Sequence, residues 1–463
     1  MAHPNELEPL RDWLTDRRVQ LGAPGDVPPY VLDAMGGDAE QLDRLRPDSR
    51  GREAFRNRLL EDREIVVLDR VTASVDLGRG EIVARIPCLG IDARVTRPTV
   101  DDVPQLLDGG AWVIARILYE ATQDNASGRN ALLLAEAKLV RTVIPDIRKL
   151  LSIIGKMKPE VWRNLLLESL GRRPEAFSQR QQELFLARLT GLVERNVNLV
   201  EFGPAGTAKS FTVGQNPYAI LMTGKVTQAR LFGNLATKAL GVFARYDLVV
   251  LDDIHEMSID GAESTSAELK GYLQEGAITR TGAEHRASGS IMMCGNIDVV
   301  NGRPVGNHLF ERMPSAFQDP PLWDRLHGYI PGYEMPPVTP QSIYRGKALA
   351  ADVLAELAHA LRTQDWSARI GDALAWNDGM TARDVRAVVR VTEGLLKWNY
   401  PAGNWDQDAL ESAATLASEL RQRVYNQMVI AAPGEFKPRR IGFAGISPFL
   451  ADDLNPAFPV RTV

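Results

Sequence analysis

The feature that most constrains the fold of this chain is a glycine-rich octapeptide that directly follows a short apolar run. The run spans Val197 to Phe202, and its β-branched residues predict a buried strand. The octapeptide consists of Gly203, Pro204, Ala205, Gly206, Thr207, Ala208, Lys209 and Ser210. A glycine-rich turn between a strand and a helix can wrap a triphosphate, so we predict that this loop binds ATP. Lys209 would then reach the β- and γ-phosphates, and Ser210 would offer its hydroxyl to Mg²⁺.

Ala208 departs from the strict form of this pattern, which has glycine immediately before the lysine. An ordinary glycine-containing turn is therefore the alternative interpretation. A second apolar run, Leu248 to Leu251, favours the nucleotide interpretation because it ends in two carboxylates, Asp252 and Asp253. In a phosphate-binding-loop enzyme the first orders Mg²⁺ through its water, and the second polarises the attacking water as general base. A solvated strand end is the alternative for this pair.

Two further residues are candidates for the hydrolytic reaction. The run Ser290 to Cys294 is followed by Gly295 and Asn296, and the Asn296 amide is predicted to hold the attacking water against the γ-phosphate. Arg325 is predicted to be an arginine finger that is supplied to a neighbouring subunit and stabilises charge on the γ-phosphate. The alternatives are an asparagine that only forms a turn and an arginine that only faces solvent.

Two arginines near the start of a later helix are candidates for sensing the nucleotide from a helical lid. Thr381 is a capping residue for this helix, and Arg383 and Arg386 lie in its first two turns. Spacing alone does not choose between the two arginines.

The order of apolar patterns predicts an α/β fold. Five candidate strands alternate with helices, which indicates a parallel sheet covered on both faces; they are Val197 to Phe202, Tyr218 to Thr223, Leu248 to Leu251, Ile291 to Cys294 and a weaker Arg325 to Ile330. We expect an AAA+ P-loop core at 196–335 and a helical lid at 336–432. A helical and small β-sheet region of OB-like type is expected at 1–125, with a helical connector at 126–195 and a tail at 433–463.

Composition excludes several classes of protein. The 463 residues contain no apolar stretch near the roughly 20 residues needed to cross a bilayer, so no membrane role is expected. The first residues lack a secretory pattern, which predicts a cytoplasmic location. Only Cys88 and Cys294 are present, far apart, so neither a disulfide framework nor a zinc site is expected. A net charge of -5 argues against coating nucleic acid through bulk basicity.

The octapeptide resembles the P-loop of the minichromosome-maintenance replicative helicases, in which an Ala-Lys-Ser ending is the signature. The segment Asp252 to Met257 is similar to the acidic motif of that family. The segment Thr279 to Ser288 looks like its basic hairpin before the sensor strand. The MCM-like interpretation therefore rests on three motifs in the same order.

A closer resemblance, over residues 10 to 430, is to the BrxL family of AAA+ proteins from bacterial BREX phage-defence systems. It rests on four segments, namely Val27 to Leu32, Leu107 to Trp112, Gly276 to Arg280 and Gly295 to Ile297. The resemblance implies a ring-forming homo-oligomer, a hexamer or double hexamer, that encircles double-stranded DNA through an N-terminal DNA-binding region. Other phage-defence proteins are further partners that it implies.

Two departures from the family pattern matter. Long members carry a Lon-like peptidase domain after the lid, and this sequence stops near where that domain would begin, so proteolysis is not expected. Asp253 stands where most of these ATPases have glutamate. Because aspartate is one methylene shorter, slow hydrolysis is expected, and Glu256 is a possible substitute base.

Three functions remain open from the sequence. The first is a DNA-encircling ATPase that contacts phosphates with Lys225, Arg280 and Arg286, although these could be ordinary solvated loop cations. The second is an unfoldase, which would usually carry an aromatic pore loop where this chain has Gly224 to Gln228. The third is a nucleotide-gated scaffold with little hydrolysis, which Asp253 motivates.

Overall fold

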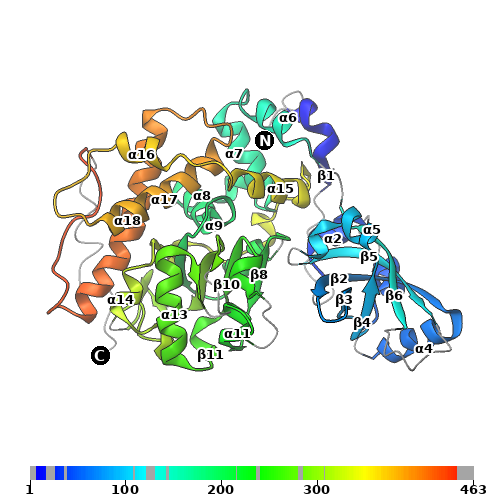
Figure 1. Ribbon diagram of the computed structural model, residues 1–463. Coiled ribbons are helices and arrows are strands. Elements are labelled where there is room, and N and C mark those ends of the chain that lie inside the picture. Colours follow the sequence, from blue (N-terminus) through cyan, green and yellow to red (C-terminus); the bar gives the residue numbers. More distant parts are fainter. Residues whose placement is uncertain are drawn as a thin grey trace. The chain divides into compact units, whose positions relative to one another are not determined.

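The apolar runs that begin at residue 197 form a parallel sheet, which lies in the larger of two structural units (Figure 1). The larger unit contains Met1–Val19 and Pro145–Val463, and the smaller contains Gln20–Ile144. Each unit has its own hydrophobic core. The structure, a computed structural model, describes residues 7–16, 27–35, 39–48, 50–107, 110–120, 131–141, 145–214, 216–235, 240–279, 285–306 and 308–445.

The sheet of the larger unit has five strands, and every neighbouring pair is parallel. In spatial order they are β17 (Gly328–Pro331), β7 (Asn198–Gly203), β14 (Ser290–Asn296), β10 (Leu248–Leu251) and β8 (Ala219–Met222). The three central strands are buried almost throughout, as continuous apolar runs predict for a parallel sheet covered on both faces. The expected α/β core is confirmed. Its fifth strand begins at Gly328 rather than Arg325, because the preceding residues form a short helix and a turn.

Helices and short two-stranded sheets complete the larger unit. The helices are α6 (Ile147–Ile154), α7 (Pro159–Ser169), α8 (Gln179–Arg188), α9 (Thr190–Val193), α10 (Lys209–Val213), α11 (Gln228–Leu231), α12 (Val242–Arg245), α13 (Ala262–Glu275), α14 (Pro320–Trp323), α15 (Ala351–Leu361), α16 (Ser367–Asp372), α17 (Ala382–Asn399) and α18 (Gln407–Ala431). The paired short strands are β1 (Leu14–Asp16) with β18 (Lys347–Leu349), β9 (Lys225–Val226) with β11 (Ser258–Ile259), β12 (Ala277–Ile278) with β13 (His285–Arg286), and β15 (Val299–Val300) with β16 (Arg303–Pro304). The 3-10 helices are η1 (Glu8–Trp13), η4 (Pro174–Ala176), η5 (Ile254–Glu256), η6 (Ser315–Phe317), η7 (Gly332–Glu334) and η8 (Pro340–Ser342).

Buried ion pairs join the two long helices of the expected lid, α17 and α18, to each other and to segments next to α9 and α14. Lys397 of α17 is fully buried, and its Nζ lies 2.5 Å from Glu194 Oε2, just after α9. Arg421 of α18 is also fully buried and binds both Asp384 and Asp324, each at 2.8 Å. α18 packs directly on β17. These helices therefore belong to the same packed unit as the sheet.

The smaller unit is built around a closed barrel of five strands. Going round the barrel, they are β2 (Glu64–Asp76), β3 (Glu81–Ile86), β4 (Ile91–Val95), β6 (Leu132–Leu139) and β5 (Ala111–Tyr119). All neighbouring pairs are antiparallel except β4 with β6. Buried apolar residues fill the barrel, among them Val67, Ala84, Ala115 and Leu134. The helices of this unit are α2 (Pro29–Ala34), α3 (Ala39–Leu45), α4 (Arg52–Asp62), α5 (Arg97–Asp102) and the 3-10 helix η2 (Pro104–Leu106).

The expected helical connector at 126–195 is corrected in its first part. Residues 132–139, which lie within that expected connector, form strand β6 and pair with β5 at 111–119. The leucine, alanine and glutamate residues of β6 favour a helix when taken alone. Pairing with β4 and β5 closes the barrel and buries Leu134, so tertiary structure overrides the local preference.

The expected N-terminal region and the expected tail also differ from the units that the structure shows. Residues 14–16, expected in the N-terminal region, pair with β18 of the larger unit. From the expected tail, Phe443 is buried in a cluster with Ile370 and Leu410. No helix in the described part of the chain is long and apolar enough to cross a membrane.

Candidate nucleotide-binding site

The glycine-rich octapeptide connects the end of β7 to the start of α10, which is the predicted strand, loop and helix order. Gly206 has a φ of 82°, in the left-handed region that favours glycine. Gly203 is needed for a different reason than expected. A Cβ there would lie 2.3 Å from the carbonyl carbon of Gly332, so the requirement is close packing of two backbone segments beneath the loop.

Ala208 adopts a left-handed conformation, with φ 53° and ψ 43°. This explains why the strict pattern has glycine at this place, since alanine is strained there.

We expect Ala208→Gly to raise the free energy of unfolding by about 1 kcal/mol, measured by chemical denaturation, without loss of nucleotide binding. Ala205→Gly is the matched control in the same loop. Ala205 is exposed and has no positive φ, so its replacement is expected to be neutral or destabilising. Equal shifts in the two variants would contradict the strain assignment.

Lys209 lies at the centre of the site. Its side chain is almost buried, and Nζ donates to the carbonyl oxygens of Gly203 at 3.2 Å and Pro204 at 2.9 Å. A third hydrogen bond reaches Asn296 Oδ1 at 3.0 Å. Burial lowers the pKa of Lys209, and the nearby carboxylate of Glu201 opposes that shift. A phosphate would provide this desolvated cation with the anionic partner that the three neutral oxygens do not supply.

The two carboxylates after β10 have different surroundings. Burial raises the pKa of Asp252, the hydrogen bond with Ser210 opposes this, and the charge of Asp253 adds to it. Asp253 is exposed, with φ 50°, and its Oδ1 accepts a hydrogen bond from Asn296 Nδ2 at 2.9 Å. Asn296 therefore links Lys209 to Asp253. All of these groups lie at the carboxyl edge of the sheet, where Asn296 is the register partner of Gly203.

Ser210 and Asp252 fit the expected protein side of a magnesium site. Their side chains already contact each other, and Asp252 is a partly desolvated carboxylate whose raised pKa a divalent cation would offset. Magnesium usually takes only one or two protein ligands and completes its shell with water and phosphate. When bound, the ion would neutralise charge on the β- and γ-phosphates.

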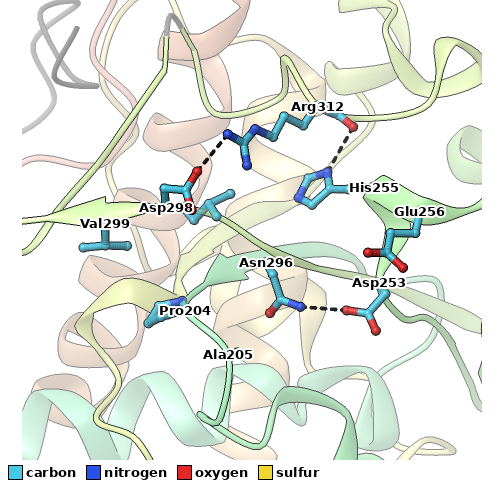
Figure 2. A pocket seen from close by; sticks show the side chains of 10 residues that line it. Pro204, Ala205, Asp253, His255, Glu256, Asn296, Asp298, Val299 and Arg312 are labelled. Carbon is cyan, nitrogen blue, oxygen red and sulfur yellow. Dashed lines mark hydrogen bonds and ion pairs between the residues drawn. The ribbon is translucent and has the colours of Figure 1, made fainter. Parts of the chain in front are cut away.

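A pocket of about 490 Å³ opens beside these residues (Figure 2). Its lining includes Pro204, Ala205, Asp253 and Asn296, which were expected at the site. It also includes His255, Glu256, Ile297, Asp298, Val299 and Arg312. Asp298 and Arg312 were missed because they follow the strand that carries Asn296, in a segment without a recognisable pattern. The only sequence feature that could have indicated Asp298 was its position two residues after Asn296.

A buried ion pair beneath the loop was also missed. Arg188 of α8 and Glu201 of β7 are bonded twice, at 2.7 and 2.6 Å, and both side chains are 0% exposed. Arg188 Nη1 also donates to the carbonyl oxygens of Thr207 and Ala208, at 3.4 and 3.3 Å. The signal was present, since a glutamate inside a buried strand requires a partner. The pair holds the loop from below.

Arg325, Arg383 and Arg386 lie together, away from Lys209. Arg325 Nη2 and Arg383 Nη2 both donate to Gln274 Oε1, at 2.9 and 3.4 Å, and Arg386 donates to the Gln274 carbonyl at 3.4 Å. The Arg325 carbonyl accepts from Asn198 Nδ2 at the first residue of β7. This cluster is therefore at the amino edge of the sheet, about 20 Å from the P-loop along the six residues of β7.

The predicted DNA-contacting cations are not brought together within the described residues. Lys225 in β9 is 66% exposed and forms an ion pair with Asp260 at 3.1 Å, close to the start of α13. Arg286 is exposed in β13, opposite Ala277 and close to the end of α13. The 14 residues of this helix span about 20 Å. Arg280 lies outside the described residues.

The comparison with protein families settles which family this is. The model for the ATPase domain described as "Lon-like protease BrxL-like" matches residues 133–442. The chain belongs to the BrxL family. The model for the N-terminal region, described as "BREX system Lon protease-like protein BrxL N-terminal", matches residues 34–119. The resemblance proposed from the motifs is therefore confirmed, and ATP hydrolysis is the activity that the matched domain indicates.

Two curated relatives carry the name "Lon-like protease BrxL". One is from Escherichia coli O9:H4 (strain HS) and the other from Bacillus cereus (strain H3081.97). Each is 27% identical over 436 residues, which is 89% of this chain. The match covers 62% of the Escherichia protein and 64% of the Bacillus protein. This BrxL family member thus spans less than two thirds of the length of these relatives.

Proposed function

We propose that this chain is a ring-forming ATPase that encircles double-stranded DNA in BREX-type phage defence, with each hydrolysis site completed by a neighbouring copy. The observation that carries the proposal is the separation of two half-sites within one chain. Lys209, Asp253 and Asn296 lie at the carboxyl edge of the sheet, whereas Arg325 lies at the amino edge. One chain cannot close this gap, so Arg325 can reach a γ-phosphate only on another copy.

Repetition of such a contact favours a ring. The contact is head-to-tail, because the P-loop surface of one copy meets the arginine surface of the next. Head-to-tail contacts close into a ring when the rotation between copies allows it. Arg383 and Arg386 share Gln274 with Arg325, so we infer that the lid arginine also acts on the neighbour's nucleotide.

The barrel supports a nucleic-acid partner. Its five strands, with the antiparallel order broken only at β4 and β6, favour the OB-like class, which binds oligonucleotides. The loop after β8 is the second support. Lys225 is exposed there, where a polypeptide-threading machine would carry an aromatic residue. DNA is therefore the proposed substrate, and the hexamer or double hexamer implied by the family is the proposed assembly.

Turnover assays test this proposal. We expect ATP hydrolysis by the purified protein to be stimulated by duplex DNA and not by an unfolded polypeptide. A second test measures the affinity for duplex DNA at several salt concentrations. When Lys225, Arg280 and Arg286 are all replaced with alanine, the slope of log DNA affinity against log salt concentration is expected to become shallower by at least about three. Lys209→Ala is the control that removes turnover. Stimulation by unfolded protein alone would support an unfoldase, and ATP binding without turnover would support a scaffold.

A further inference from the structure

Arg312 lies on the nucleotide pocket, on a segment that follows the hairpin of β15 and β16. Its Nη2 forms an ion pair with Asp298 Oδ2 at 2.8 Å. Figure 2 shows the Arg312 side chain extending along the pocket to the carboxylate of Asp298. Among the described residues that line this pocket, Arg312 is the one arginine or lysine, and the carboxylates are Asp253, Glu256 and Asp298.

The backbone of Arg312 is fixed although its side chain is half exposed. The carbonyl oxygen accepts a hydrogen bond from His255 Nδ1 at 3.1 Å. The His255 ring packs on Phe202, with centroids 4.6 Å apart, and it lies so close to Gly295 that a Cβ there would be 2.4 Å from Nε2. Burial lowers the pKa of His255, which favours the neutral ring, and Nδ1 must carry the proton in this hydrogen bond because a carbonyl oxygen can only accept. Arg312 is thus anchored to the acidic turn and to the strand that carries Asn296.

The ion pair with Asp298 is weak enough to exchange. The two side chains are 50% and 69% exposed, and ion pairs between such exposed groups contribute little to stability. A phosphate offers the guanidinium two parallel charge-assisted hydrogen bonds, which are roughly twice as strong as neutral ones. The γ-phosphate would also add negative charge beside the three carboxylates that line this pocket, so a cation in addition to Lys209 and Mg²⁺ would stabilise it there.

We propose that Arg312 is a nucleotide-responsive residue whose guanidinium leaves Asp298 and binds the γ-phosphate of ATP on the same chain. The inference rests on the proposed ATP site and adds a γ-phosphate contact to it. Arg312 thereby discriminates ATP from ADP, and Asp298 competes with the nucleotide for the arginine. Removing Arg312 should therefore weaken ATP binding, whereas neutralising Asp298 should strengthen it. A salt bridge with a purely structural role would not give these opposite effects.

Nucleotide binding in the presence of Mg²⁺ tests this assignment. The probes are a β,γ-imido analogue of ATP and ADP, with affinities measured by calorimetry. Arg312→Ala is expected to weaken binding of the analogue about tenfold and to leave ADP binding unchanged. Asp298→Asn is expected to tighten binding of the analogue by up to about fivefold, again without an effect on ADP.

Two controls keep the outcomes distinct. Arg303→Ala removes an exposed arginine of the neighbouring hairpin that does not line the pocket, and it is expected to change neither affinity. Lys209→Ala is expected to abolish binding of both nucleotides. If Lys209→Ala binds ATP normally, the proposed ATP site itself is wrong. If Lys209→Ala fails to bind nucleotide, the ATP site stands. In that case, only the role of Arg312 is overturned if the Arg312 and Asp298 variants change the analogue affinity in the same direction, or if Arg312→Ala weakens binding of both nucleotides equally.

Discussion

Arg325→Ala is expected to lower ATP turnover by about a thousandfold while ATP binding by the same chain stays unchanged. The rate effect is that of an arginine finger, which stabilises charge only as it develops on the γ-phosphate. Binding is unaffected because Arg325 lies at the amino edge of the sheet, at the opposite end of β7 from Lys209. Single-turnover hydrolysis and calorimetric binding of a non-hydrolysable analogue give the two quantities separately.

Mixing two inactive variants tests whether the finger acts between copies. Arg325→Ala chains keep an intact P-loop, and Lys209→Ala chains keep an intact finger. Random mixing in equal amounts should restore activity at about one quarter of the interfaces, because each active one needs one chain of either kind in the right order. Rings that contain both variants and remain inactive would contradict the shared site.

The turnover rates of Arg383→Ala and Arg386→Ala decide between the two lid arginines. Arg383 has a second partner, since Nη1 forms an ion pair with Asp324, whereas Arg386 reaches only the Gln274 carbonyl among the contacts described above. A residue that senses nucleotide must be free to exchange partners, and Asp324 is also held by Arg421. We therefore expect Arg386→Ala to be the more harmful of the two for turnover.

The sequence could predict those site residues that directly follow an apolar run typical of a buried strand. The P-loop, Asp252, Asp253 and Asn296 each follow an apolar run. Parallel pairing brings the ends of such runs to one edge, so their meeting could be expected before any coordinates were known.

The features that were missed depend on contacts between distant segments. Leu134 lies in a stretch with helical composition, and only its pairing partners make it a strand. Arg188 at the end of α8 pairs with Glu201 in β7, and it also donates to the Ala208 carbonyl, which supports the P-loop from beneath. Arg312 reaches the pocket because His255 holds its carbonyl oxygen. None of these contacts has a fixed spacing that a single sequence could reveal.

The buried pair of Arg188 and Glu201 leads to the second large effect. Arg188→Ala is expected to lower the free energy of unfolding by roughly 3 to 5 kcal/mol, because it leaves Glu201 charged, 0% exposed and without its partner. The midpoint of urea unfolding measures the change. Arg180→Ala is the matched control, since Arg180 is 34% exposed and Glu419 would keep Arg423 as a partner. That loss is expected to be about 1 kcal/mol or less.

A double variant separates stability from function at this pair. Arg188→Met with Glu201→Leu replaces both charges by apolar side chains of similar size, which is often neutral for stability, so most of the lost unfolding free energy should return. Arg188→Ala should also weaken nucleotide binding, and this affinity should not return in the double variant, because the carbonyl oxygens of Thr207 and Ala208 still lack the donor that holds the loop. If the double variant recovers both properties, the pair only fills the core. Recovery of stability alone identifies Arg188 as a positioning residue for the P-loop, retained despite the cost of burying a charge beneath it.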